Sequence, residues 1–249
     1  MKNSILGIIV ARGGSKRVPR KNIRQIAGMP LIYYTIKAGL ESGLITRLIV
    51  SSEDTEIIEY SKSLGVDVPF VRPKELALDH VPTIDVILHA LEFIKDSENV
   101  SYDYACILEP TSPLRNSSDI DTALKGLVES DCDSLIGLSP APSATPYRIR
   151  YIEDGLVKLA FEEEYYDYSA NKDKYPKAFI PGGGIFCAKV EAFMRERDLM
   201  PGKALPHIIP FHRGIDINDM SDFFIAEAML CQGSVKDSFS EKDREVPTQ

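Results

Sequence analysis

The residues best suited to chemistry form a basic loop near the N-terminus. A continuous apolar run at residues 6–11 leads directly into this loop, which contains Gly13 and Gly14. One serine and five cationic side chains accompany the glycines: Ser15, Arg12, Lys16, Arg17, Arg20 and Lys21. Glycine lets backbone N–H groups approach an anion closely, and arginine and lysine neutralise several phosphate charges at once. The loop therefore predicts a polyphosphate ligand, although a solvated turn has a similar composition.

A second polar segment, EPTSPLR at residues 109–115, follows another apolar run. Its two prolines restrict the backbone, so the hydroxyls of Thr111 and Ser112 and the guanidinium of Arg115 are held in place. Such positioning suits a binding site. The alternative is that the segment only starts the next helix, with Ser118 as its N-cap.

Asp216 and Asn218 are the candidate metal ligands. They stand two residues apart, and on an extended segment this spacing points both side chains the same way. Two oxygen ligands can then converge on one hard cation such as Mg²⁺, with a single negative charge because asparagine is neutral. Asp219 or Ser221 is expected to cap the helix that follows.

Strand and helix patterns alternate between these segments. Strands are expected at residues 6–11, 47–52, 66–70, 104–108 and 134–138, and helices at residues 30–43, 54–64 and 83–94. The alternation predicts an α/β fold with a doubly wound, mostly parallel, Rossmann-like sheet. Because such sheets bind ligands at the carboxyl ends of their strands, the two polar segments are expected at one site.

The pattern loosens at residues 139–180. This stretch holds a turn-rich segment, a short strand pattern at 147–151, an Asp154-Gly155 hairpin turn and an acidic, tyrosine-rich run. We interpret it as a subdomain inserted into a single domain of residues 1–233. It has few apolar residues for a core of its own, so we expect it to dock on a symmetric partner and form a homodimer. Residues 234–249 lack apolar clustering and are expected to be a disordered tail.

Composition excludes several classes of function. The 249 residues are 44% apolar and carry a net charge of −8, which argues against binding to nucleic acid or to anionic membranes. No apolar run is long enough to span a bilayer and no signal-peptide pattern is evident, so a cytoplasmic protein is expected. The four cysteines are widely spaced, which favours neither a zinc site nor a disulfide framework.

The basic loop resembles the N-terminal signature of the sugar nucleotidyltransferases, and more narrowly that of the CMP-nonulosonate (sialic acid) synthetases. That signature reads approximately AR(S/G)GSK followed by KN. Three further segments are similar to family patterns: RPKELALD at residues 72–79 to RPxELAxD, EPTSPLR to QPTSPLR, and the stretch around residue 216 to IDID. The resemblance spans roughly residues 5–232.

The resemblance implies transfer of CMP from CTP to a 2-keto-3-deoxy sugar acid, with release of pyrophosphate and no covalent enzyme intermediate. The implied nucleotide-binding residues are Ala11, Arg12, Gly13, Gly14, Ser15, Lys16, Lys21, Asn22, Arg72, Asp79 and Thr83. The implied sugar-binding residues are Glu109, Thr111, Ser112, Arg115 and Arg148. Arg12, Lys16 and Lys21 would hold the triphosphate, and Asp216 with Asn218 would hold Mg²⁺. The insertion would form the dimer contact and reach over the neighbouring active site.

Departures from the family pattern leave the identity of the acceptor sugar undetermined. Glu109 stands where the family has glutamine, and basic residues that the family shows near residues 172–183 are missing. No general base is assigned: a metal-bound hydroxide and an unassigned side chain both stay open. The alternatives are a nucleotidyltransferase for Kdo or for a non-acidic sugar phosphate, and a non-catalytic nucleotide-binding module.

Overall fold

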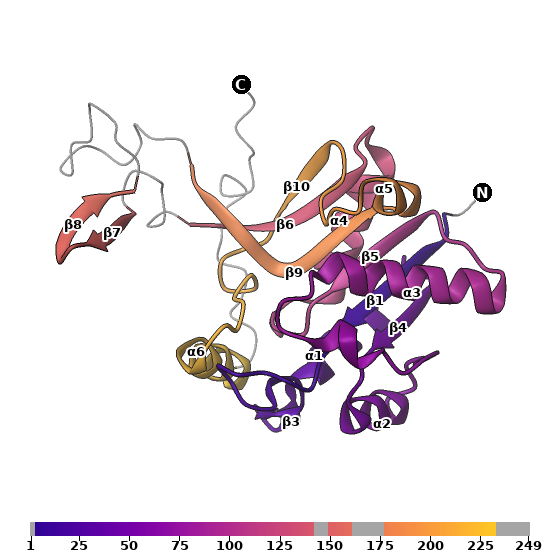
Figure 1. Cartoon of the computed structure of the whole chain (residues 1–249), viewed down its shortest axis with the longest axis horizontal. Coiled ribbons are helices and arrows are strands. Elements are labelled where there is room, and N and C mark those ends of the chain that lie inside the picture. The colour runs from indigo at the N-terminus through magenta and orange to yellow at the C-terminus, as the bar shows by residue number, and fades with distance from the viewer. Residues whose placement is uncertain (1–2, 142–148, 161–176, 233–249) are drawn as a thin grey trace.

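A computed structural model of the chain describes residues 3–141, 149–160 and 177–232 (Figure 1). Its centre is a six-stranded sheet in the order β10-β6-β9-β5-β1-β4. The strands are β1 (Ile5–Val10), β4 (Arg47–Ser51), β5 (Tyr104–Leu108), β6 (Ser134–Pro140), β9 (Phe179–Lys189) and β10 (Ala204–Ile208). β9 runs antiparallel to β5 and β6, whereas the other pairs are parallel. The predicted mostly parallel α/β sheet is confirmed.

Helices cover both faces of this sheet, which is why its strands contain continuous apolar runs. The helices are α1 (Leu31–Leu40), α2 (Thr55–Ser63), α3 (Thr83–Glu98), α4 (Ser117–Glu129), α5 (Val190–Glu196) and α6 (Met220–Cys231). Ile5 and Ile9 of β1 pack in one core with residues of α1 and α4. Leu6 and Ile8 point to the other face and pack with α3 and α5, and Figure 1 shows α3 crossing in front of the strands.

Helix starts follow the local side-chain chemistry. The Asn116 side chain accepts from the Asp119 N–H and caps α4, so the alternative cap at Ser118 is wrong. Asp219 caps α6 in a capping box with Asp222, as predicted. Capping α6 at this residue fixes where the preceding segment, which carries the candidate metal ligands, must end.

Several predicted elements differ from the observed ones. Residues 66–70 are not a strand; Asp67 makes a single bridge to Ile49. The edge strand β10 escaped prediction because Pro206 interrupts its pattern. The first helix begins one residue late, since β3 (Met29–Pro30) pairs with β2 (Gln25–Ile26) in a small hairpin.

The stretch between β6 and β9 leaves and re-enters the sheet at one point, where Pro140 pairs with Phe179. Its described part is a hairpin of β7 (Arg150–Glu153) and β8 (Leu156–Leu159). The hairpin turns at Asp154 and Gly155, which have φ of 53° and 76°, so the predicted turn is confirmed. In Figure 1 this hairpin stands apart from the sheet. No helix in the described ranges has the length and apolarity needed to cross a bilayer.

A buried arginine lies under the carboxyl edge of the sheet. Arg115 is only 2% exposed. Its Nη1 donates to the carbonyls of Gly183 (2.7 Å) and Gly184 (3.2 Å), and its Nη2 donates to Thr35 Oγ1 (2.8 Å). The two glycines have φ of 73° and 54°, near a register shift between β6 and β9 that bends β9. Arg115 therefore supplies a donor to the Gly183 carbonyl and a second donor to the Gly184 carbonyl, which also accepts from the Glu109 N–H (2.9 Å).

We predict that Arg115→Ala lowers the free energy of unfolding by about 3 kcal/mol or more, because the buried acceptors around this side chain lose a charged hydrogen-bond donor. Urea denaturation measures this. Arg195→Ala is the control: this arginine is exposed and pairs with Glu196, and its loss should change stability by about 0.5 kcal/mol or less. Equal stabilities of the two variants would contradict the structural role of Arg115.

Candidate active site

A cavity of 590 Å³ opens at the carboxyl ends of β1 and β5. It collects side chains from the basic loop, from residues 72–86, from the turn after β5 and from the segment before α6. The predicted site residues that line it are Arg12, Ser15, Lys16, Lys21, Asn22, Arg72, Asp79, Thr83, Glu109, Thr111, Asp216 and Asn218. Segments from both ends of the chain thus meet at the edge where α/β sheets bind ligands.

Other predicted residues lie behind the wall of this cavity. The sequence predicts that the Gly13 N–H donates to phosphate. In the structure this N–H donates to Glu53 Oε1 (2.8 Å). Ser112 is fully buried, with Oγ 3.5 Å from Asp216 Oδ1. Arg115 is enclosed under the sheet edge and does not line the cavity, which corrects the expectation that its head contacts the sugar.

The remaining predicted residues add little side-chain chemistry. Ala11 contributes its backbone carbonyl, which accepts from Arg72. Gly14 has open space around it, because a methyl group added to its α-carbon would meet no atom within 4 Å beyond its chain neighbours. Arg148 lies outside the described residues.

Arg72 joins the ends of β1 and β4 beneath the basic loop. Its Nη2 donates to the carbonyl of Ala11 (3.1 Å) and to that of Ser51, and its Nε donates to Ser51 Oγ (3.1 Å). Burial lowers the pKa of Arg72 to about 10, and the nearby Glu53 carboxylate opposes that effect. Arg72 therefore stays charged at neutral pH and holds the base of the loop.

Glu53 is a residue that sequence reasoning missed. One carboxylate oxygen accepts from Gly13, and the other is buried without a hydrogen-bond partner in the described part of the chain. Its position directly after β4, at the same edge as the loop, was the available signal.

Lys21 ties the basic loop to the candidate metal segment. Its Nζ donates to the carbonyl of Ile217 (2.7 Å), and burial lowers its pKa while the Asp216 carboxylate opposes this. Asn22 closes the loop on itself, because its Nδ2 donates to the carbonyl of Arg12 (2.9 Å). The cationic head of Lys21 thus lies between the loop and the acidic end of the cavity.

The acidic end of the cavity holds Asp216, Asn218 and Glu109. Asn218 Nδ2 donates to Asp216 Oδ2 (3.1 Å), so the two side chains lie together as their spacing predicted. Burial, and next the Asp216 carboxylate, raise the pKa of Glu109 to about 7. Within the described ranges no three His, Cys, Asp or Glu residues form a metal-ligand cluster.

Asp79 bridges two cations of the basic loop. Its Oδ1 is 2.6 Å from Arg12 Nη1 and its Oδ2 is 2.5 Å from Lys16 Nζ. The hydrogen bonds from Lys16 and Arg12 lower the pKa of Asp79.

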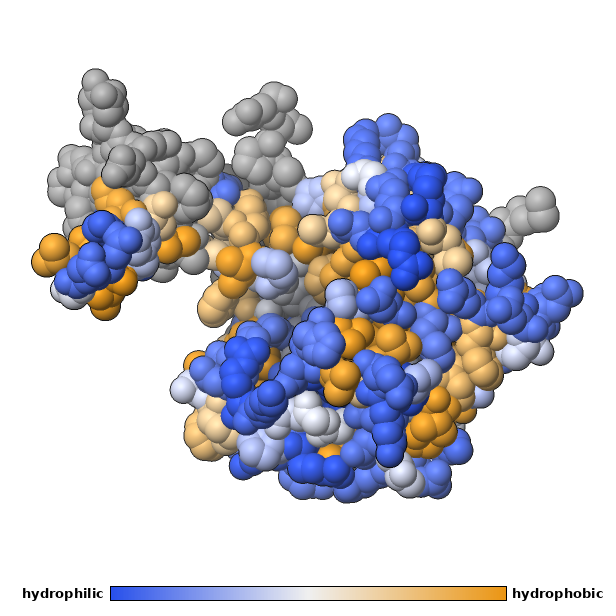
Figure 2. Space-filling view, viewed as in Figure 1, coloured by the Kyte–Doolittle hydropathy of each residue, from blue (hydrophilic) through white to orange (hydrophobic). Residues whose placement is uncertain are grey.

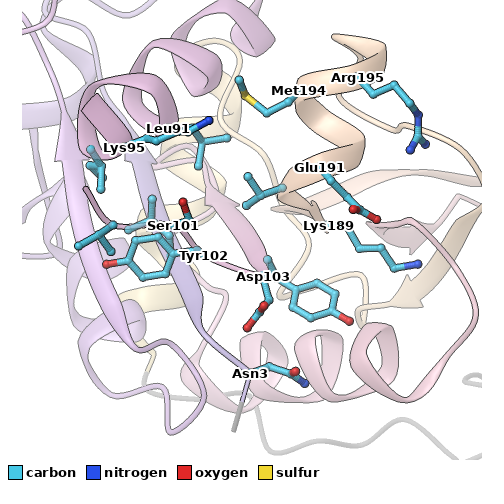
Figure 3. A pocket seen from close by; sticks show the side chains of 15 residues that line it. Asn3, Leu91, Lys95, Ser101, Tyr102, Asp103, Lys189, Glu191, Met194 and Arg195 are labelled. Atoms are coloured by element: carbon cyan, nitrogen blue, oxygen red, sulfur yellow. The ribbon is translucent and has the colours of Figure 1, made fainter. Parts of the chain in front are cut away.

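A larger cavity of 790 Å³ lies at the other edge of the sheet, between the ends of α3 and α5 (Figure 3). Its floor is apolar, and much of its charge is already paired within the protein. Lys189 pairs with Asp133 (3.0 Å), Arg195 pairs with Glu196 (2.6 Å), and Asp103 accepts from the Ser4 N–H (2.7 Å). The smaller cavity is therefore the candidate active site, because the chemistry-bearing side chains converge there.

The model of the cytidylyltransferase family matches residues 6–236 of this chain. The chain belongs to this family. It is 32% identical over 232 residues to the pseudaminic acid cytidylyltransferase of Campylobacter jejuni subsp. jejuni serotype O:23/36 (strain 81-176), covering 92% of this chain and 96% of the relative. It is 30% identical to the CMP-N,N'-diacetyllegionaminic acid synthase of Legionella pneumophila subsp. pneumophila (strain Philadelphia 1), covering 91% and 96%.

Two further likenesses extend this picture. The chain is 31% identical to the N-acylneuraminate cytidylyltransferase of Escherichia coli O18:K1:H7 (strain RS218 / NMEC), covering 91% of this chain and 52% of that protein. Among solved structures, it resembles a CMP:2-keto-3-deoxy-manno-octonic acid synthetase complexed with CTP, with a TM-score of 0.67 and 14% identity, covering 93% of this chain and 100% of the other. The low identity makes this last likeness evidence for the fold.

Proposed function

We propose that this cytidylyltransferase transfers CMP from CTP to a nonulosonic acid and releases pyrophosphate. The relatives named above act on pseudaminic, N-acylneuraminic and diacetyllegionaminic acids, which share this sugar class. The observation that carries the proposal is the charge lining one cavity, where Arg12 and Lys16 of the basic loop are joined by Lys21, whose pKa burial lowers and the Asp216 carboxylate raises. A polyphosphate lying along Arg12, Lys16 and Lys21 would meet positive charge along its length.

The basic loop would hold the triphosphate. Arg12, Lys16 and Lys21 offer charge-assisted hydrogen bonds, and Ser15 adds a hydroxyl at the same wall. Because pyrophosphate leaves with additional negative charge, these cations would stabilise the transition state as well as the bound nucleotide.

The acidic end fits a Mg²⁺ ion. Asp216 and Asn218 lie in contact through the amide nitrogen of Asn218. Rotation of that amide would bring its oxygen beside the Asp216 carboxylate, and carboxylate and amide oxygens are ligands that this cation prefers. When bound, Mg²⁺ supplies positive charge against the phosphates. With one formal charge on the ligand pair, much of the coordination would come from CTP itself. Glu109 and Thr111 line the neighbouring wall, where the acceptor hydroxyl would approach the α-phosphate.

The test is pyrophosphate release from CTP with a panel of nonulosonic acids and Kdo. We expect turnover with at least one nonulosonic acid, a requirement for Mg²⁺ and CTP together, and no detectable turnover for Asp216→Ala. Asp96→Ala, a change on the exposed side of α3, should keep wild-type activity.

Asn218→Asp adds a second carboxylate and should strengthen Mg²⁺ binding, without necessarily raising kcat. Full activity of Asp216→Ala in saturating CTP would exclude this metal site. If no sugar supports turnover, the alternative of a non-catalytic nucleotide-binding module would be favoured.

Lys21→Ala should weaken CTP binding by about 1.5 to 3 kcal/mol, or roughly tenfold and more, because a charge-assisted contact is lost. Calorimetric titration of CTP measures the change. Lys62→Ala, on an exposed lysine of α2 that pairs with Glu59, should bind CTP like the wild type. If both variants bind equally, Lys21 does not contact the nucleotide.

We also propose that residues 139–180 are a dimerisation subdomain of the single domain and that the protein is a homodimer. The hairpin β7–β8 exposes Ile152 (76%), Leu156 (67%) and Val157 (71%), and apolar side chains are visible on it in Figure 2. A two-stranded hairpin is marginally stable alone, so a covering surface would stabilise it. The use of CTP, a nucleotide of the cytoplasm, supports a cytoplasmic location.

Light scattering at micromolar concentration should give about twice the chain mass of 27.7 kDa. Exchanging Ile152 and Val157 for serine together should shift the protein to the monomer, because the exposed apolar surface is lost. Leu40→Ser removes an apolar group exposed at the end of α1 and should leave the dimer intact. A wild-type monomer would reject this assembly.

A further inference from the structure

Asp79 occupies the position at which the basic loop is expected to receive phosphate. Its two carboxylate oxygens lie 2.6 Å from Arg12 Nη1 and 2.5 Å from Lys16 Nζ. Among the described residues it is the acidic partner found for both cations. A phosphate group presents oxygens of the same charge and similar spacing, so Asp79 and a phosphate would use the same donors.

The backbone that carries Asp79 is fixed on both sides. Arg72 is 4% exposed and bound to the ends of β1 and β4, and Thr83 begins α3. Between them lie a short 3-10 helix, Lys74–Ala77, and an exposed Leu78. The Ala77 carbonyl adds a longer contact to Arg12 Nη1 (3.5 Å). The segment therefore presents Asp79 to the loop from across the mouth of the cavity.

These ion pairs are suited to exchange. The Lys16 side chain is 85% exposed, and exposed ion pairs are weak and screened by salt. A triphosphate or pyrophosphate carries several charges and can replace a single carboxylate on these cations. When no ligand is bound, the Asp79 carboxylate offsets the repulsion between the Arg12 and Lys16 cations, which lie close together.

We propose that Asp79 is an electrostatic placeholder for the nucleotide phosphates, an inference that rests on the proposed nucleotide site. In the free enzyme Asp79 holds Arg12 and Lys16 together and lowers the affinity of the loop for phosphate. When the phosphate chain binds, it displaces the carboxylate from the two cations. After transfer the carboxylate competes with pyrophosphate for them and so favours its release.

Charge removal distinguishes this role from a direct contact with the nucleotide. Asp79→Asn frees both cations, so inorganic pyrophosphate and CTP should each bind severalfold more tightly than to the wild type. A residue that contacts only the nucleoside would weaken CTP binding and leave pyrophosphate unaffected. A residue needed only for the loop's structure would weaken the binding of both.

The experiment is calorimetric titration of inorganic pyrophosphate, and separately of CTP, into the full chain at low ionic strength. Asp85→Asn is the matched control, because it removes the same charge and an exposed ion pair with Arg197. It should bind both ligands like the wild type. In a Lys16→Ala background the gain from Asp79→Asn should shrink, because one of the two cations is absent.

Unchanged or weaker pyrophosphate binding by Asp79→Asn overturns the placeholder role, as does an equal gain in Asp85→Asn. If the wild type binds neither pyrophosphate nor CTP, the proposed nucleotide site fails together with this inference. Binding by the wild type without a gain in Asp79→Asn rejects the placeholder alone and leaves the nucleotide site standing.

Discussion

The arrangement of the cavity depends on the hydrogen bonds that the buried guanidinium of Arg115 donates to backbone carbonyls. The guanidinium donates to carbonyls at the bend of β9 and, at 3.3 Å, to the carbonyl of Glu109, so it fixes the turn after β5 from below. The turn after β5 in turn positions the segment before α6, because the Ile217 N–H donates to the Thr111 carbonyl (2.8 Å). Lys21 then holds the Ile217 carbonyl and connects this segment to the basic loop.

Arg72 and Arg115 stabilise the fold by donating to backbone carbonyls, whereas Arg12 and Lys16 of the loop line the cavity. Burial lowers the pKa of Arg72 and of Arg115 to about 10, so both stay protonated at neutral pH while bonded to backbone carbonyls. The planar guanidinium can satisfy several acceptors at once, which a lysine cannot do in the same geometry. Arg12 and Lys16 instead reach the cavity, where the carboxylate of Asp79 meets them.

The electrostatics of the site are local. The whole chain carries a net charge of −8, yet one cavity gathers the cations Arg12, Lys16 and Lys21. Such a group of cations suits a substrate that is anionic along its length. The excursion between β6 and β9 returns to the sheet beside the same bend that Arg115 holds, so the inserted region and the cavity share one structural support.

The sequence by itself determined most strands of the central sheet, the polar segments at its carboxyl edge and most of the side chains that line the candidate cavity. Apolar runs that end in glycine, proline and charged residues are local signals, and strand alternation limits the topology to few arrangements. The sequence also predicted the N-cap of α6 and the turn at residues 154–155, because both depend only on residues that are neighbours in the chain. Local signals failed for β10 and for residues 66–70, where an edge position and a single bridge leave no periodic pattern.

Only the tertiary structure decided which polar residues face the cavity and which are buried beneath it. Arg115 and Arg12 are the same residue type at the ends of two similar strands, yet one lies under the sheet and the other lines the cavity. The difference depends on β9, whose bent backbone presents the carbonyls of Gly183 and Gly184 to Arg115 from about 70 residues away along the chain. Likewise, the Gly13 N–H donates to Glu53, a carboxylate brought to it by the neighbouring strand. The burial of a charge is set by long-range packing and hydrogen bonding, which residue type and spacing do not encode.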